Sequence, residues 1–206
     1  MNDVAALRRK PTQARALERV ERILTAASEL IAETGSDAVK MTEVAERAGV
    51  PIGSLYQYFP DKAAILKTLA ERIGARVRAG IAASLEGVDT GAEALARLDR
   101  LLENYYAMFL DEPVVRDIWS GTQSDKALQA LDIEDSRANG RLVAGALKHL
   151  VPRREQARFE TVCFLTMQLT GAAVRLAIAV DRKEGDRLMA EYRRLLQTEL
   201  GAFLRA

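Results

Sequence analysis

The sequence contains one cysteine, Cys163, and one histidine, His149, among 206 residues. A single cysteine excludes an intramolecular disulfide, and a single histidine excludes the usual histidine-rich zinc sites. Glycine-rich phosphate loops, metal-ligand spacings and nucleophile elbows are also missing from the sequence. We therefore expect no metal, no cofactor and no catalytic site, and the sequence does not indicate an enzyme.

The few reactive side chains have simple structural interpretations. Cys163 lies in an apolar stretch, where a buried and inert thiol is expected. His149 is predicted at an exposed position or in the last turn of a helix. Asp132, Glu134 and Asp135 form a weak carboxylate cluster, which we interpret as the start of a helix, where negative charge is favourable.

Long apolar runs and a strong net charge are missing as well. No uninterrupted apolar run reaches the roughly 18 residues needed to span a membrane, and the polar N-terminus lacks the apolar core of a signal peptide. A cytoplasmic protein without a membrane partner is expected. The net charge is +1, but residues 1–80 carry 13 Lys/Arg and 10 Asp/Glu. Any surface that faces phosphates is therefore expected in this part.

β-Branched and aromatic residues are sparse, whereas Ala, Leu, Arg and Glu are abundant, and no strand-like alternation occurs. This composition predicts an all-α fold. A flexible basic arm of residues 1–10 is expected to precede the helices. The predicted helices span about 13–34, 41–48, 51–59, 61–83, 92–110, 114–130, 133–150, 153–180 and 184–205.

Three short helical segments near the N-terminus are separated by turn signals. Gly49 stands where a tight turn needs a positive φ, and Pro51 opens the next helix. Pro60 breaks that helix, and Asp61 can cap the following one. Small apolar side chains inside this segment can hold two short helices close together; they are Val44, Ala45, Ala48, Val50 and Leu55.

This arrangement is typical of a helix-turn-helix, whose second helix enters the major groove of DNA. Short or polar groups at the N-terminal end of that helix can reach base edges. The side chains predicted to project outward are Ile52, Gly53, Ser54, Tyr56, Gln57 and Tyr58.

The same segment carries a continuous signature without gaps. It consists of Val44-Ala45-Glu46-Arg47-Ala48-Gly49-Val50, Gly53-Ser54-Leu55-Tyr56-Gln57-Tyr58-Phe59 and Asp61-Lys62, followed by Leu66. It closely resembles the tetracycline-repressor (TetR) family of transcriptional regulators. The resemblance implies an N-terminal three-helix DNA-binding domain and a C-terminal helical domain for ligand binding and dimerisation. It also implies a repressor that binds a palindromic operator as a homodimer and is released by a small molecule.

The resemblance further implies roles for single residues. The family positions that face bases are matched by Ile52, Gly53, Ser54 and Gln57. Tyr56 and Tyr58 match positions that contact phosphate or thymine methyl groups, Lys62 matches a phosphate contact, and Thr42 lies where the preceding helix abuts the DNA backbone.

Two positions depart from the family pattern, and others allow a second interpretation. Lys40 replaces a frequent Thr cap and could itself touch phosphate, while Pro51 replaces a small polar residue, whose contact could be lost. Tyr56 could instead pack against the first helix, and Phe59 is expected in the core. The basic residues 8–10 are either a solvated tail or a contact to DNA.

We predict a DNA-binding domain in residues 1–60, a linking helix at 61–83 and an effector-binding and dimerisation domain in residues 84–206. Helices 153–180 and 184–205 are expected to pair with their symmetry mates in a four-helix interface. The alternative is that both helices bury their apolar stripes within one subunit. The predicted interface residues are Gly171, Leu188, Tyr192, Leu195 and Leu196.

A mainly apolar effector is expected among the helices of residues 92–180, although bulky residues at helical spacing can equally be ordinary core. Arg175 could pair with an anionic effector or with a carboxylate of another helix. Besides the repressor, a helical interaction module and a constitutive regulator without an effector are considered. The predicted pocket residues are Tyr105, Phe109, Trp119, Phe164, Met167 and Gln168.

Overall fold

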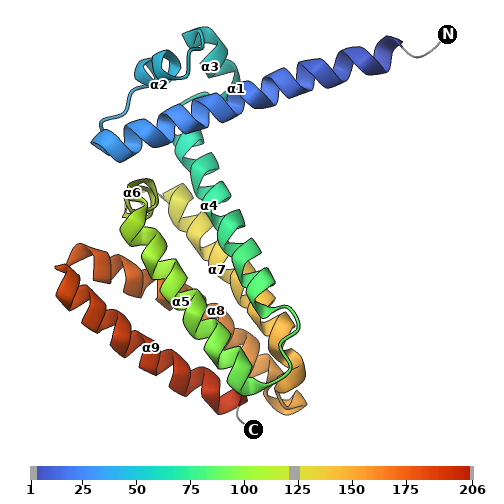
Figure 1. Ribbon diagram of the computed structural model, residues 1–206, viewed down its shortest axis with the longest axis vertical. Helices are drawn as coiled ribbons and strands as arrows, with labels where there is room; N and C mark the ends of the chain where they lie inside the picture. The colour runs from blue at the N-terminus through green and yellow to red at the C-terminus, as the bar shows by residue number, and fades with distance from the viewer. Residues whose placement is uncertain (1–3, 121–125, 205–206) are drawn as a thin grey trace. The chain divides into compact units, whose positions relative to one another are not determined.

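A computed structural model describes residues 4–120 and 126–204, with side chains from residue 14 onward. In these ranges every regular element is a helix, and no strand is present. The predicted all-α fold is confirmed. The chain forms two compact units, Met1–Leu69 and Ala70–Ala206 (Figure 1).

The first unit contains α1 (Val4–Thr34), α2 (Met41–Arg47), α3 (Ile52–Tyr58) and the start of α4 (Lys62–Leu85). Helix α1 is long and α2 and α3 are short, and each contributes apolar side chains to one small core. The side chain of Asp61 accepts a hydrogen bond from the backbone of Ala64 at 2.8 Å, and so caps α4 as predicted. The buried core residues include Ile23, Leu24, Ala27, Val39, Val44, Ala45, Leu55, Phe59 and Ile65.

Helix α1 begins earlier than the sequence predicts. Its backbone is helical from Val4 and passes through Pro11, so the flexible arm ended by this proline is a wrong prediction. Alanine, leucine, arginine and lysine dominate residues 5–10, and all are strong helix formers. The possible DNA contact of the basic residues 8–10 falls on side chains outside those described and stays a prediction.

The second unit contains the rest of α4, α5 (Gly91–Asp111), α6 (Pro113–Ser120), α7 (Lys126–Leu147), α8 (Gln156–Ala179) and α9 (Arg182–Leu204). Helix α8 packs along both α7 and α9, and α5 packs on α9 (Figure 1). Phe159 and Phe203 join α8 to α9 with their ring centroids 5.2 Å apart. Further core residues are Ile81, Leu85, Val88, Ala94, Val143, Leu147, Cys163 and Leu200.

The predicted helix break near residue 132 is wrong, because α7 runs without interruption from Lys126. Asp132 and Asp135 therefore do not start a helix. Each carboxylate instead pairs with an arginine of a neighbouring helix, Arg175 on α8 and Arg78 on α4. These partners are distant in the sequence, so the local pattern of charges does not reveal them.

Helix α8 also corrects the expectation about apolar runs. By length and composition, the segment Arg153–Ala179 is apolar enough to cross a membrane, because its most apolar 18-residue window has a mean hydropathy of 1.6, with 28% of that window buried. Helix α8 packs between α7 and α9 in the second unit. This packing covers only part of its apolar surface. Cys163 is buried in this helix as predicted, and burial raises the pKa of its thiol to about 12.

Candidate nucleic-acid interface and ligand cavity

The turn between α2 and α3 is a Schellman motif. The backbone N–H of Gly49 donates to the carbonyl of Glu46, and that of Val50 donates to the carbonyl of Ala45, both at 3.0 Å. Gly49 has a φ of +63°, which a residue with a side chain rarely adopts. The turn thus stops α2 abruptly and starts α3 only three residues later.

One face of α3 is anchored in the core of the first unit. Leu55 is fully buried and Phe59, which follows the helix, is 5% exposed, so the predicted core position of Phe59 is confirmed. The carbonyl of Pro51 accepts hydrogen bonds from the backbone of Ser54 at 2.8 Å and of Leu55 at 3.1 Å. These contacts fix how the helix presents its other face.

The opposite face of α3 is open to solvent and includes two large apolar side chains. Ile52 is 40% exposed and Tyr56 is 49% exposed, so the packing of Tyr56 against α1 is at most partial. Ser54 and Tyr58 are half-buried. The exposed candidates are Pro51, Ile52, Gly53, Tyr56 and Gln57.

Helix α2 begins directly after Lys40, whose backbone is extended. The carboxylate of Glu43 accepts a hydrogen bond from the backbone N–H of Lys40 at 3.3 Å and lies 3.7 Å from its Nζ atom. Glu43 thereby satisfies a donor at the start of the helix, where the family often has a threonine cap. Lys40 and Thr42 are both exposed at this end.

Arg47 holds α2 against α1, a role that the sequence pattern did not indicate. Its guanidinium donates two hydrogen bonds to Glu33, at 2.9 and 3.0 Å, and one to Glu29 at 3.5 Å. The hydrogen bonds from Arg47 lower the pKa of Glu33. The charge of Arg47 is therefore already paired with carboxylates.

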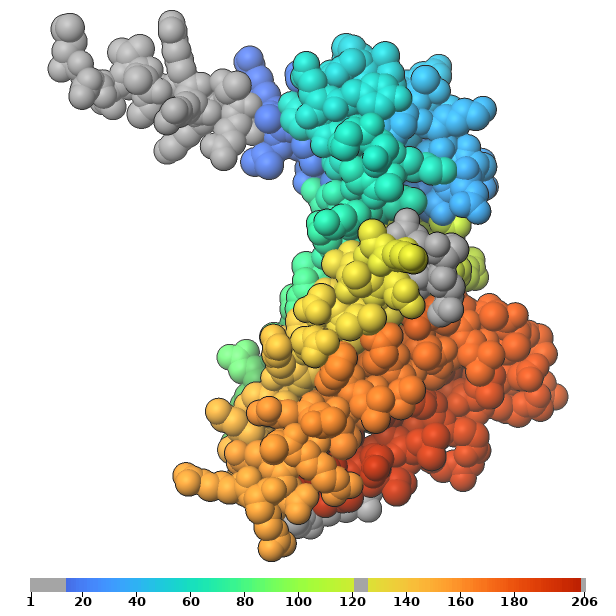
Figure 2. Space-filling view, turned by 180° about the vertical axis from the view of Figure 1, so that it is seen from behind, coloured from blue at the N-terminus to red at the C-terminus, as the bar shows by residue number. Residues whose placement is uncertain are grey.

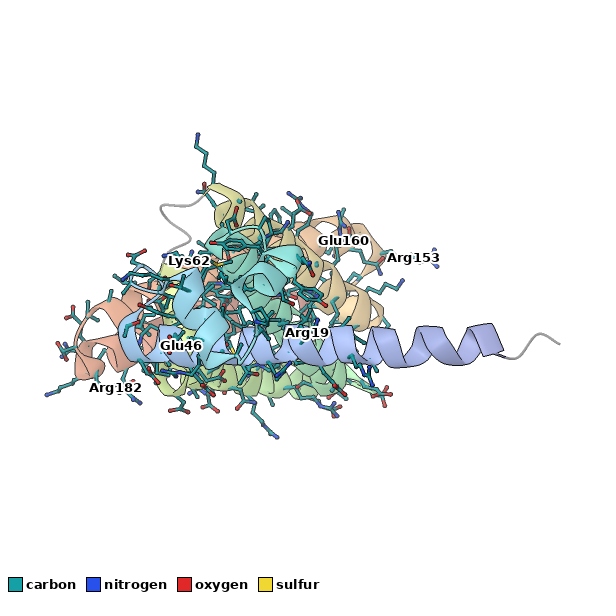
Figure 3. All side chains as sticks on the ribbon, turned by 90° about the horizontal axis from the view of Figure 1, so that it is seen from above. Arg19, Glu46, Lys62, Arg153, Glu160 and Arg182 are labelled. Carbon is teal, nitrogen blue, oxygen red and sulfur yellow. The ribbon has the colours of Figure 1, made fainter. Side chains whose placement is uncertain are left out.

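Lys62, labelled in Figure 3, has partners inside the first unit. Its Nζ atom donates hydrogen bonds to the backbone carbonyls of Ser36, at 2.7 Å, and Asp37, at 2.9 Å. The ammonium group thus ties the start of α4 to the loop after α1. Two of its three N–H donors are used in this way, and the predicted phosphate contact depends on the third.

We expect Lys62→Met to lower the free energy of unfolding by about 1–2 kcal/mol, because two charge-assisted hydrogen bonds are lost. Lys40→Met is the matched control, since Lys40 is exposed and its change should cost less than about 1 kcal/mol. Urea denaturation measures both. Lys62→Met could instead leave stability unchanged and reduce the slope of log DNA affinity against log salt concentration by about one unit. That result would show that Lys62 acts mainly on phosphate.

The second unit encloses a cavity of about 440 Å³ between its helices. This volume lies in the usual range for small-molecule sites. Tyr105, Phe109, Trp119 and Met167 line it, whereas Phe164 and Gln168 are not among the lining residues. The side chain of Gln168 donates to Asp132, and the ring of Phe164 lies 4.6 Å below the guanidinium of Arg137. The other apolar lining residues include Ile73, Val77, Ile81, Leu95, Leu98, Leu101, Leu102, Met108 and Leu200.

A stripe of polar side chains on α7 lines the cavity and was missed by the sequence interpretation. Asp132, Asp135, Ser136 and Asn139 line it at helical spacing. The predicted break near residue 132 had left Asp132 outside the helix that carries the other three. Arg175 pairs with Asp132 at 3.6 Å, which confirms the interpretation that it meets a carboxylate of another helix.

Four of the predicted interface residues are buried or half-buried in the isolated subunit. Gly171 and Leu196 line the cavity, and Leu188 is half-buried. The hydroxyl of Tyr192 lies 2.9 Å from both the carbonyl oxygen of Thr166 and the hydroxyl of Thr170. Burial raises the pKa of Tyr192 to about 12. These four residues are thus at least partly covered within the subunit, and their place in a dimer interface stays a prediction.

A different apolar stripe is exposed on the same two helices, whose surfaces adjoin in Figure 2 in orange and red. On α8, Leu165, Leu169 and Leu176 are 53%, 46% and 53% exposed; on α9, Leu195 is 66% exposed. Only Leu195 belongs to the predicted set. We call these four leucines the leucine stripe.

Two family models together match most of the chain. Residues 92–204, more than half of the sequence, match the model described as "Tetracyclin repressor-like, C-terminal domain". Residues 23–69 match "Bacterial regulatory proteins, tetR family". The chain belongs to the tetracycline-repressor family.

Solved structures of this family agree with that assignment along nearly the whole chain. A TetR-family transcriptional regulator from Streptomyces coelicolor is 28% identical, with a TM-score of 0.70, and the match covers 91% of this chain and 98% of that one. The fold is also shared with the repressor FadR of Thermus thermophilus, solved with lauroyl-CoA. Its TM-score is 0.65 at 22% identity, and the match covers 86% of this chain and 92% of that one.

Curated relatives match a short part of the chain. The transcriptional repressor KstR of Rhodococcus jostii is 47% identical over 55 residues, which cover 27% of this chain and 26% of the relative. KstR of Mycobacterium tuberculosis is 42% identical over 62 residues, which cover 30% and 28%. The matched part thus spans just over a quarter of the length of these repressors.

Proposed function

We propose that this TetR-family protein is a transcriptional repressor that binds a palindromic operator as a homodimer and is released by a small molecule. The observation that carries the DNA-binding part is the open face of α3. Half-exposed apolar side chains on a short, rigidly anchored helix fit a surface that is covered by a partner. Two curated relatives that match a short part of the chain are themselves repressors.

In this proposal the N-terminal part of α3 reads base edges in the major groove. Two equivalent helices require half-sites about one helical turn, or roughly 34 Å, apart, or a multiple of that distance. Tyr56 and Tyr58 contact phosphates or thymine methyl groups, and Lys40, Thr42 and Lys62 lie toward the DNA backbone. The base-reading residues are Ile52, Gly53, Ser54 and Gln57, and Pro51 precedes them at the DNA-facing start of the helix.

Gly53→Ala separates DNA contact from stability. A Cβ atom added at Gly53 meets nothing within 4 Å, and alanine favours a helix over glycine by roughly 0.5–1 kcal/mol. We expect equal or higher stability but weaker operator binding, because the methyl group blocks close approach to bases. Gln57→Ala should cost about 1–3 kcal/mol at one base pair and relax specificity there.

The measurement is sequence enrichment from a random duplex library by the purified protein, followed by binding titrations of both variants. The protein should enrich a palindrome. An interaction module that kept the fold without the function would enrich no sequence. If Gly53→Ala bound the enriched operator as tightly as the wild type, the assignment of α3 to the groove would be wrong.

The leucine stripe supports the homodimer. Leu165, Leu169 and Leu176 follow one another at intervals of four and seven residues and therefore share one side of α8. Leu195 extends the stripe onto α9. An apolar surface formed by two adjoining helices can pair with its own copy around a twofold axis, which gives a four-helix interface. No other copy is needed to build the cavity of one subunit.

The cavity supports regulation by a ligand and argues against a constitutive regulator with a solid core. Helix α4 is continuous from Lys62 to Leu85 and lines the cavity from Ile73 to Ser84. In the chain, α4 directly follows the DNA-binding helices. A ligand that favours one arrangement of α4 can therefore change the position of those helices. A tenfold change in operator affinity needs only about 1.4 kcal/mol of coupling. A repressor that binds the DNA of a bacterial cell acts in the cytoplasm, so this is the location that we propose.

A further inference from the structure

The carboxylates that line the cavity are all neutralised by arginines. Of the lining residues in the described part of the chain, four are acidic, two are arginines and none is lysine or histidine. The ion pairs are Asp99 with Arg193, Glu112 with Arg76, Asp132 with Arg175, and Asp135 with Arg78. The Nη1 atom of Arg175 lies 3.6 Å from Asp132 and makes no hydrogen bond in the described structure. A charged ligand of either sign would therefore have to compete with an existing ion pair.

The wall formed by α7 is nevertheless rich in hydrogen-bond acceptors. The Oδ2 atom of Asp135 and the Oδ1 atom of Asn139 are buried and have no hydrogen-bond partner in the described structure. Ser136, which is 7% exposed, adds a hydroxyl between them. Gly74 on α4 leaves room for Asp135, since a Cβ atom at that position would collide with the carboxylate. Buried acceptors without donors are unfavourable and would gain from a ligand that supplies them.

Tyr105 adds a neutral hydroxyl on the opposite helix, α5. Its ring packs edge-on against Phe109, with centroids 5.1 Å apart, and it lines the cavity. Its hydroxyl makes no hydrogen bond within the described residues, which leaves it free to donate or accept. Burial and the carboxylate of Asp132 raise the pKa of Tyr105, so the group stays an O–H at neutral pH.

We propose that the cavity binds a neutral, mainly apolar molecule that carries at least one hydroxyl group, placed between Tyr105 and the polar wall of α7, and that it discriminates against carboxylates. The apolar remainder of the ligand fills the space between the leucine, isoleucine and methionine side chains. A carboxylate would have to break an existing arginine pair or be buried without a counter-charge, and both are costly. This inference rests on the proposed function, since it specifies the ligand of the same cavity.

The experiment uses three probes with one carbon skeleton: 2-naphthol, 2-naphthoate and naphthalene. Calorimetric titration of the full-length protein should show that 2-naphthol binds at least ten times more tightly than 2-naphthoate. Tyr105→Phe keeps the ring but removes the hydroxyl, and should weaken 2-naphthol about tenfold while leaving naphthalene unchanged. Tyr106→Phe is the matched control, because the Tyr106 hydroxyl bonds Asp186 at 3.2 Å and Tyr106 does not line the cavity.

The outcomes separate the ligand class from the proposed function. The ligand class is overturned if 2-naphthoate binds as tightly as 2-naphthol, or if Tyr105→Phe and Tyr106→Phe behave alike. It is also overturned if 2-naphthol fails to bind a protein that still enriches its operator, which leaves the regulator standing. A protein that binds 2-naphthol as expected but enriches no duplex sequence supports the ligand class and contradicts the repressor.

Discussion

The double variant Leu169→Glu, Leu176→Glu is expected to be monomeric at micromolar concentrations at which the wild type is a dimer. Both side chains lie on the leucine stripe and are about half exposed in the isolated subunit, so the substitutions should leave the subunit folded. In a symmetric interface, however, they would place four carboxylates in an apolar contact without partners. Sedimentation velocity measures the change directly.

Loss of the dimer should also weaken operator binding by roughly 10²–10⁴-fold, because the second half-site no longer binds intramolecularly. Ile133→Glu is the control: this residue is 37% exposed on α7, outside the stripe, and the variant should remain dimeric. Helical content by circular dichroism checks that the double variant is folded. A wild-type monomer, or a double variant that stays dimeric, would contradict the proposed interface.

Gly140→Ala is expected to lower the free energy of unfolding by about 1–3 kcal/mol, the usual cost of overpacking a core. A Cβ atom at Gly140 on α7 would lie 2.7 Å from the Cα and 2.8 Å from the backbone nitrogen of Phe164 on α8. Backbone atoms cannot rotate away as a side-chain end can, so the two helices would have to separate. Thermal and urea denaturation measure the loss.

Gly145→Ala, in the same helix, provides a control of opposite sign. A Cβ atom there meets nothing within 4 Å, and replacing a helical glycine by alanine should raise stability by roughly 0.5–1 kcal/mol. If Gly140→Ala were also stabilising, the close approach of α7 and α8 would not exist in solution. Two substitutions of the same chemistry thus test the packing of the helices separately from helix propensity.

The helix-turn-helix could be predicted from the sequence because its determinants are local. Gly49 ends α2 through backbone conformation alone, and Asp61 caps α4 through a contact three residues away. The side chains that anchor α3 also lie within a few residues of it. The turn residues alone were therefore enough to predict that the side chains around Ile52 and Gln57 are exposed. The roles of Lys62 and Arg47 depend on more distant segments, the loop at Ser36 and Asp37 and the end of α1.

The second unit shows the opposite case, for which helix α8 is the main example. Its sequence is apolar on all sides, so helical periodicity does not distinguish the face toward the cavity from the face toward solvent. Gly171 was expected in the interface but lines the cavity, whereas Leu165 and Leu169 are exposed. The positions of α7 and α9 beside α8 decide which side is covered.

By itself, the sequence determined the all-α fold, the helix-turn-helix and the family, because composition, helical spacing and turn residues act over short distances along the chain. The tertiary structure alone decided the polar wall of the cavity, the pairing of Asp132 with Arg175 and the leucine stripe. Asp132 and Arg175 lie on different helices, the leucine stripe is formed by two helices, and the polar residues of α7 face a cavity that several helices enclose. Which side chains become neighbours depends on how the helices pack, and a local sequence pattern does not determine that packing.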